Sequence, residues 1–103
     1  DPVLTITGPQ ARAARALVQW PRDHVARAAD LKEETLLSFE TGDTDLDPHA
    51  QHRLRMALEA GGAVFLPENG DGGIGVRLKF TTKDVRAIDS LENEGGAYGS
   101  DDV

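Results

Sequence analysis

The sequence contains no cysteine, which excludes a disulfide scaffold and any zinc site built from thiolates. A chain without cysteine suits a reducing compartment, so we expect a cytoplasmic protein. No apolar run is long enough to cross a bilayer, and the first residues lack the pattern of a signal peptide, so we expect no membrane partner. The sequence also has few basic side chains: it contains 11 Lys and Arg residues but 18 Asp and Glu residues. The formal net charge of −7 excludes a protein that coats nucleic acid by bulk charge, although it permits a locally basic docking face.

The first sixty residues carry a helical pattern. Thr7 is placed to cap a helix that begins near Pro9, and Asp47 followed by Pro48 is a second start signal. Helical spacing puts four residues of the first helix on one apolar face: Ala13, Ala16, Leu17 and Trp20. The helix after Asp47 has its own inward set, which ends before Gly61 and Gly62: Ala50, Leu54, Ala57 and Leu58.

The apolar period changes from helical to two after this helix. Val76, Leu78 and Phe80 alternate with charged residues, which is typical of a half-buried strand. The segments "AVFLPE" and "IGVRLKF" flank the loop "NGDGG", so we predict a β-hairpin over residues 63–80. Residues 81–94 return to helical spacing. Beyond them the chain is rich in Gly, Ser and Asp, and we predict a disordered acidic tail over residues 94–103.

Between residues 24 and 42 the sequence "HVARAADLKEETLLSFETG" has the spacing of two short helices joined by a tight bend. Val25 and Ala29 lie four residues apart on the first helix, and Leu36 and Phe39 lie three apart on the second. Leu31 follows the bend and can fill the gap between them. Two helices that cross steeply around a short turn need this arrangement, so a helix-turn-helix is predicted.

These segments resemble the Cro/repressor-type helix-turn-helix regulators of bacteria and phages, often called the XRE family. The matching stretches are "RAARALVQW", "PRDHVARAADL" and "KEETLLSFETG", followed by "LRMALEAGGAVFLPENG". The resemblance covers about residues 5–80. It implies a mainly α fold with a four- to five-helix Cro/repressor-like helix-turn-helix domain over residues 1–62. A C-terminal β-hairpin or strand pair and a short helix over residues 63–93 would then form the dimerisation element.

The resemblance also implies which side chains would meet DNA. The base-reading set comes from the recognition helix: Lys32, Glu33, Glu34, Leu37 and Ser38. The phosphate-contacting set is Arg12, Arg15, Arg22, Thr35 and Thr41. Chemically, Lys32 can donate to guanine, Glu33 can accept from the cytosine amino group, and Leu37 can meet a thymine methyl. Asp30 occupies the turn position that usually holds Gly, and Asp tolerates the left-handed conformation better than most residues.

Three other sequence patterns are better explained without a catalytic or ligand-binding role. "GDGGIG" at residues 70–75 resembles a phosphate-binding loop, but a strand follows it where such a loop needs a helix. His49 and His52 lie three apart, and we interpret them as exposed side chains rather than metal ligands. Ser38 and Ser90 have no convincing base partner. We therefore expect no catalytic residue, no metal and no cofactor, and the protein is predicted not to be an enzyme.

Two functions of different classes remain. The first is a sequence-specific transcriptional regulator, associated with the nucleoid, that binds double-stranded DNA at a pseudo-palindromic operator as a homodimer. Its predicted dimerisation residues are Phe65, Val76, Leu78, Phe80, Val85, Ile88 and Leu91. The alternative is a protein-interaction module, an antitoxin or an adaptor for a second regulator, that does not bind DNA directly. Charge favours the alternative, because residues 1–59 hold seven basic and ten acidic side chains. A single positive surface formed by Arg12, Arg15, Arg22 and Lys32 would favour DNA.

Overall fold

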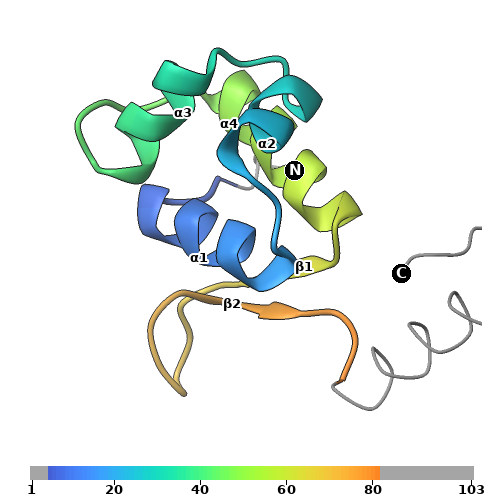
Figure 1. Ribbon diagram of the computed structural model, residues 1–103. Coiled ribbons are helices and arrows are strands. Elements are labelled where there is room, and N and C mark those ends of the chain that lie inside the picture. The colour runs from blue at the N-terminus through green and yellow to red at the C-terminus, as the bar shows by residue number, and fades with distance from the viewer. Residues whose placement is uncertain (1–4, 82–103) are drawn as a thin grey trace, which may run out of the picture.

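The computed structural model of this chain describes residues 5–81, which form a mainly helical domain with a two-stranded antiparallel sheet (Figure 1). The first helix lies between the hairpin and the other helices. In chain order the elements are α1 Gly8–Val18, α2 Arg22–Ala28, α3 Glu33–Glu40, α4 Pro48–Ala60, β1 Ala63–Leu66 and β2 Gly75–Leu78.

Helix α1 begins as predicted. The Thr7 side chain accepts from the Gln10 backbone N–H at 3.2 Å, and the Gln10 side chain accepts from the Thr7 N–H at 3.0 Å. This reciprocal capping box satisfies two of the N–H groups that a helix start leaves without partners. The Gln10 amide also donates to the backbone oxygen of Gly75 at 2.9 Å, so one side chain joins the helix start to the hairpin.

The predicted inner face of α1 is wrong. The helix buries Ala11 and Ala14, whereas Ala13, Ala16 and Leu17 are exposed. Two causes account for the difference. The helix ends at Val18, and Gln19 adopts a left-handed conformation with φ 60°, so Trp20 no longer follows helical spacing. The neighbours of α1 also lie on two sides of it, the hairpin on one and α3 on the other, and small alanines let both approach closely.

The remaining helices follow the predicted pattern closely. In α4, Asp47 caps the first turn by accepting from the Ala50 N–H at 3.0 Å. This bond is the main reason why the pKa of Asp47 lies below its ordinary value. The helix buries the four residues expected of it, and together with α2 and α3 it encloses Val25, Leu36, Leu54 and Leu58, the largest side chains that are almost fully buried.

The predicted hairpin over residues 63–80 is confirmed. Strands β1 and β2 pair antiparallel, with Ala63 opposite Leu78 and Phe65 opposite Val76. The Phe65 ring lies in the core of its own chain, under the Arg55 guanidinium at 5.2 Å. Phe80 lies beyond the end of β2 and is 42% exposed. The two strands therefore differ: β1 contributes buried side chains to the core, whereas the chain at the end of β2 exposes an apolar side chain to solvent.

The predicted C-terminal helix, its apolar residues Val85, Ile88 and Leu91, and the predicted tail over residues 94–103 all lie outside the described residues. They remain predictions.

Candidate nucleic-acid interface

The bend between α2 and α3 has the geometry that the sequence predicts. Asp30 adopts φ 58°, in the left-handed region, as expected for the position that usually holds glycine. The Leu31 N–H then donates to the Ala26 carbonyl at 2.8 Å, which closes the bend. The Leu31 side chain is partly buried and packs against the core. The bend therefore fixes the direction in which α3 leaves α2.

Helix α3 divides into an anchored face and a free face. Leu36, Phe39 and Glu40 are buried. The first turn and the middle of the opposite face carry exposed side chains: Lys32, Glu33, Glu34 and Leu37. Leu37 is 41% exposed although it is a large apolar residue. The prediction that Leu36 and Phe39 face the core is therefore confirmed, and the base-reading role of the exposed positions stays a prediction.

The backbone at the end of α3 lies in close contact with the backbone at the start of α1. A Cβ atom added to Gly8 would overlap the carbonyl oxygen of Phe39, so only glycine permits this approach. Phe39 itself is 3% exposed. The position of α3 is therefore set at both ends, by the bend at Asp30 and by the contact at Gly8.

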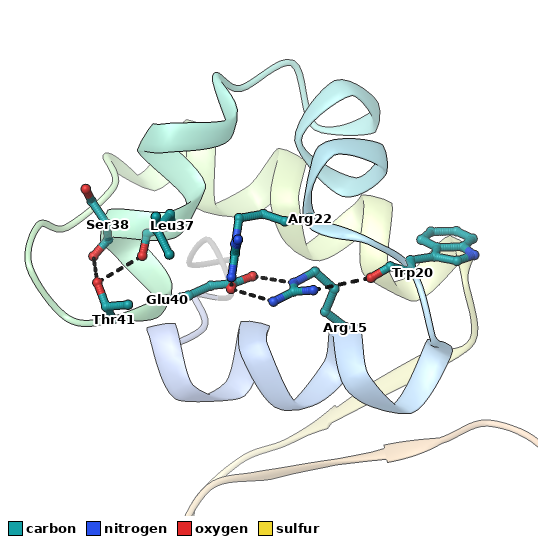
Figure 2. Close-up of polar contacts among 7 residues, drawn as sticks. All are labelled: Arg15, Trp20, Arg22, Leu37, Ser38, Glu40 and Thr41. Carbon is teal, nitrogen blue, oxygen red and sulfur yellow. Dashed lines mark hydrogen bonds and ion pairs between the residues drawn. The ribbon is translucent and has the colours of Figure 1, made fainter.

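Glu40 forms an ion-pair cluster that links three helices. Its side chain is only 1% exposed and accepts from Arg15 Nε at 2.8 Å, Arg15 Nη2 at 2.9 Å and Arg22 Nε at 3.3 Å. Figure 2 shows Arg15 from α1 and Arg22 from α2 converging on this carboxylate. We call Arg15, Arg22 and Glu40 the arginine cluster. The hydrogen bond to Glu40 raises the pKa of Arg15, so its guanidinium stays charged throughout the accessible pH range.

Arg15 and Arg22 were predicted from sequence as phosphate contacts, whereas Glu40 was not among the predicted site residues, although one signal pointed to it. Glu40 lies four residues after Leu36, so a helix that buries Leu36 turns Glu40 inward as well. A buried carboxylate needs a cationic or hydrogen-bonding partner. What the sequence did not supply was the identity of that partner, because Arg15 lies 25 residues away along the chain.

Two of the predicted phosphate contacts therefore have protein partners. The Arg15 side chain is 17% exposed and the Arg22 side chain is 29% exposed, and both are paired with Glu40. Arg12 is exposed one helical turn before Arg15. The proposed single positive surface of Arg12, Arg15, Arg22 and Lys32 is thus partly neutralised from within the fold.

The predicted hydroxyl contacts also differ from one another. Thr41 is exposed, but its hydroxyl donates to the Leu37 carbonyl at 2.9 Å and so helps to close the end of α3 (Figure 2). Thr35 and Ser38 are half-buried. The Ser38 carbonyl accepts from the Asp43 N–H at 2.8 Å. The Thr41 hydroxyl and the Ser38 carbonyl therefore help to close the end of α3.

Acidic residues outnumber basic ones in residues 22–40, which span α2, the bend and α3 and which we call the bihelical segment. Residues 22–40 contain three Lys and Arg and five Asp and Glu. Glu33 and Glu34 lie in the first turn of α3, where the positive end of the helix dipole stabilises negative side chains. The same carboxylates repel a DNA phosphate from that helix end. On the neighbouring helix, Arg27 pairs with Asp23 at 3.3 Å. The charge of this surface is therefore less favourable to a phosphate than the helix-turn-helix motif alone would suggest.

Within residues 5–81 no group of three or more His, Asp or Glu side chains is arranged to hold a metal ion. Over the same residues, no helix combines the length and the apolar character needed to cross a membrane. No protein-family model matches the chain, and no curated protein matches it significantly.

Proposed function

We propose that the protein is a sequence-specific DNA-binding regulator that reads base edges with α3. The observation that carries this proposal is the two-faced character of α3. Its inner face is held by the core, by Gly8 and by the arginine cluster, while Lys32, Glu33 and Leu37 stand free on the outer face. A helix that is fixed from behind and polar in front, with an exposed apolar residue, has the properties needed to enter a major groove.

Sequence specificity at this surface would depend on unfavourable contacts with wrong DNA sequences as much as on favourable contacts with the right one. A carboxylate that meets no donor in the groove is desolvated without compensation, so Glu33 would disfavour every site that lacks a cytosine amino group opposite it. Lys32 would supply the matching attraction to guanine. With three basic and five acidic residues in the bihelical segment, non-specific binding would be weak, because that term is almost wholly electrostatic.

We also propose that the regulator acts as a homodimer. The end of β2 and the outer side of α1 border a hollow of about 320 Å³, which is lined in part by Leu17, Leu78 and Phe80. Leu17 is 39% exposed and Phe80 is 42% exposed. A second copy placed here would cover apolar surface that the domain leaves open. Phe65 and Val76, in contrast, pack within their own chain and would support this surface from behind.

A selection from random-sequence duplex DNA, followed by fluorescence anisotropy at one fixed salt concentration, tests the proposal. Lys32→Ala should weaken binding to the enriched sequence while leaving the melting temperature unchanged. Arg77→Ala is the matched control, because Arg77 is exposed on β2, away from α3, and does not line the hollow proposed for the second copy. Glu33→Gln should tighten binding to random DNA and reduce the ratio of specific to random affinity. An unchanged ratio would show that Glu33 does not discriminate between sequences.

A second candidate function is a protein-interaction module. The arginine cluster favours it, because Arg15 and Arg22 are committed to Glu40 and leave an acidic surface around α3. If the selection enriches no sequence, and if Lys32→Ala and Arg77→Ala behave alike, the protein partner replaces DNA in this proposal. The same free face of α3 would then be the docking surface.

A further inference from the structure

A shallow hollow of about 410 Å³ opens between α4 and the C-terminal end of α2. We call it the α2–α4 hollow. It is lined by Trp20, Ala28, Ala29, Asp30, His52, Arg53, Met56, Ala57 and Ala60. Met56 is 53% exposed, the largest exposed fraction among the large apolar residues of the described chain. Neither the core nor the candidate DNA surface explains an apolar side chain in this position.

The shape of the α2–α4 hollow suits a helix. Small alanines form much of its floor, so the backbone of a partner can approach closely. Met56 is unbranched and can adapt to the side chains laid against it. The rim carries charged and titratable groups of both kinds: Arg53, whose Nε donates to the Ala29 carbonyl at 3.0 Å, and exposed His52 from α4, with Asp30 from the bend after α2. An amphipathic segment with acidic flanks would complement both the floor and the rim.

We propose that residues 82–93 of the same chain cover the α2–α4 hollow. In their sequence, "TKDVRAIDSLEN", helical spacing places Val85, Ile88 and Leu91 on one narrow apolar face. The acidic residues Asp84, Asp89 and Glu92 fall within or beside that face on the same spacing. The segment therefore offers apolar side chains to the alanines and Met56 of the hollow, and carboxylates to Arg53 at its rim. This inference does not depend on DNA binding.

The chain has the reach for this arrangement. Phe80 lines the neighbouring hollow together with Gly61 and Gly62. Gly61 in turn lies against the Trp20 ring, since a Cβ added there would lie 2.8 Å from a ring carbon. Trp20 borders the α2–α4 hollow, so the last described residues end one side chain away from it. A helix of twelve residues spans about 18 Å, close to the length of α4, so the segment can run along that helix.

Trp20 makes the proposal directly measurable, because it is the only tryptophan in the protein. In the full-length chain, replacing Val85, Ile88 and Leu91 together by Ser should expose the hollow. We expect a higher acrylamide quenching constant for Trp20 and a shift of its emission to the red. Adding a peptide of residues 82–95 to this variant should restore the protection.

Met56→Glu tests the other side of the contact. Met56 is exposed, so a glutamate there leaves the core intact but places a negative charge opposite the acidic segment. It should raise Trp20 quenching as the triple Ser variant does, and the two changes combined should add nothing further. Ile74→Glu is the matched control, because Ile74 is 48% exposed on the hairpin and does not line the α2–α4 hollow. Far-ultraviolet circular dichroism checks that each variant is folded.

Three results would overturn the proposal. The first is Trp20 quenching that neither Met56→Glu nor the triple Ser variant changes. The second is an equal effect of Ile74→Glu. The third is protection that rises with protein concentration in step with dimer formed in sedimentation, because a second copy would then cover the hollow.

Discussion

Replacing Glu40 by Gln tests the arginine cluster with little change of shape. The substitution keeps the size of the side chain and removes its charge, so Arg15 and Arg22 would face a neutral amide whose NH₂ group is itself a donor. Three hydrogen bonds now reach the Glu40 carboxylate, at 2.8, 2.9 and 3.3 Å. A hydrogen bond to a charged group stabilises a protein by about 1 kcal/mol more than a neutral one, which gives an upper bound of about 3 kcal/mol.

Partial exposure of the two arginines lowers this bound. Their side chains are 17% and 29% exposed, so each guanidinium can recover some contact with water after the charge on Glu40 is lost. We therefore expect Glu40→Gln to reduce the free energy of unfolding by about 2 kcal/mol. For a domain of this size that corresponds to a fall in Tm of about 10 °C.

Urea unfolding followed by circular dichroism measures the loss, provided that the slope with denaturant stays constant. Glu59→Gln is the matched control, because Glu59 pairs with Arg55 at 2.9 Å within one helix and its side chain is 35% exposed. That variant should lose less than about 0.5 kcal/mol. Equal losses in the two variants would refute the view that Glu40 holds the helices together. So would a double-mutant cycle between Arg15 and Glu40 with no coupling energy.

Three further predictions follow from the described contacts. Phe39→Ala should lower stability by about 3–5 kcal/mol and Leu37→Ala by less than about 0.5 kcal/mol, and equal losses in denaturant unfolding would show that the faces of α3 are misassigned. Gly8→Ala should cost about 1–3 kcal/mol because its Cβ would overlap the Phe39 carbonyl, whereas Gly70→Ala, which meets no atom, should be nearly neutral; a stabilised Gly8→Ala would contradict this. The pKa of Asp47 is lowered below 3.8 in the folded state, so its stabilisation is complete above that pH and is lost as the pH falls through the lower folded value. The difference in Tm between wild type and Asp47→Ala should therefore narrow as the pH falls below 3.8, and a difference that stays constant down to about pH 2 would rule out this role for the carboxylate.

The features that the sequence predicted correctly are those set by neighbours along the chain. Thr7 and Asp47 cap helices because each needs only a backbone N–H three residues on. Asp30 takes the left-handed conformation because the bend is completed within a few residues. The hairpin likewise follows from its alternating strands and its loop.

The features that the sequence did not predict depend on distant parts of the chain. Leu17 has the chemistry of a core residue, yet it is exposed because the hairpin and α3 pack against other sides of α1. Arg15 has the chemistry of a phosphate contact, yet its partner is a carboxylate 25 residues away. The sequence pattern therefore predicts where the helices lie, but it does not show which of their charged side chains form ion pairs within the fold.

The side chain of Gln10 has a consequence for how the protein is synthesised. Its amide joins the start of α1 to Gly75, 65 residues further along the chain. A nascent chain that has emerged only as far as residue 40 already contains α1, α2, α3 and every member of the arginine cluster. It does not yet contain α4, which supplies Leu54 and Leu58 to the core, or β2, against which α1 packs. We therefore expect the ion pairs among α1, α2 and α3 to form early on the ribosome, whereas the hydrogen bond from Gln10 to the hairpin forms only after β2 has emerged.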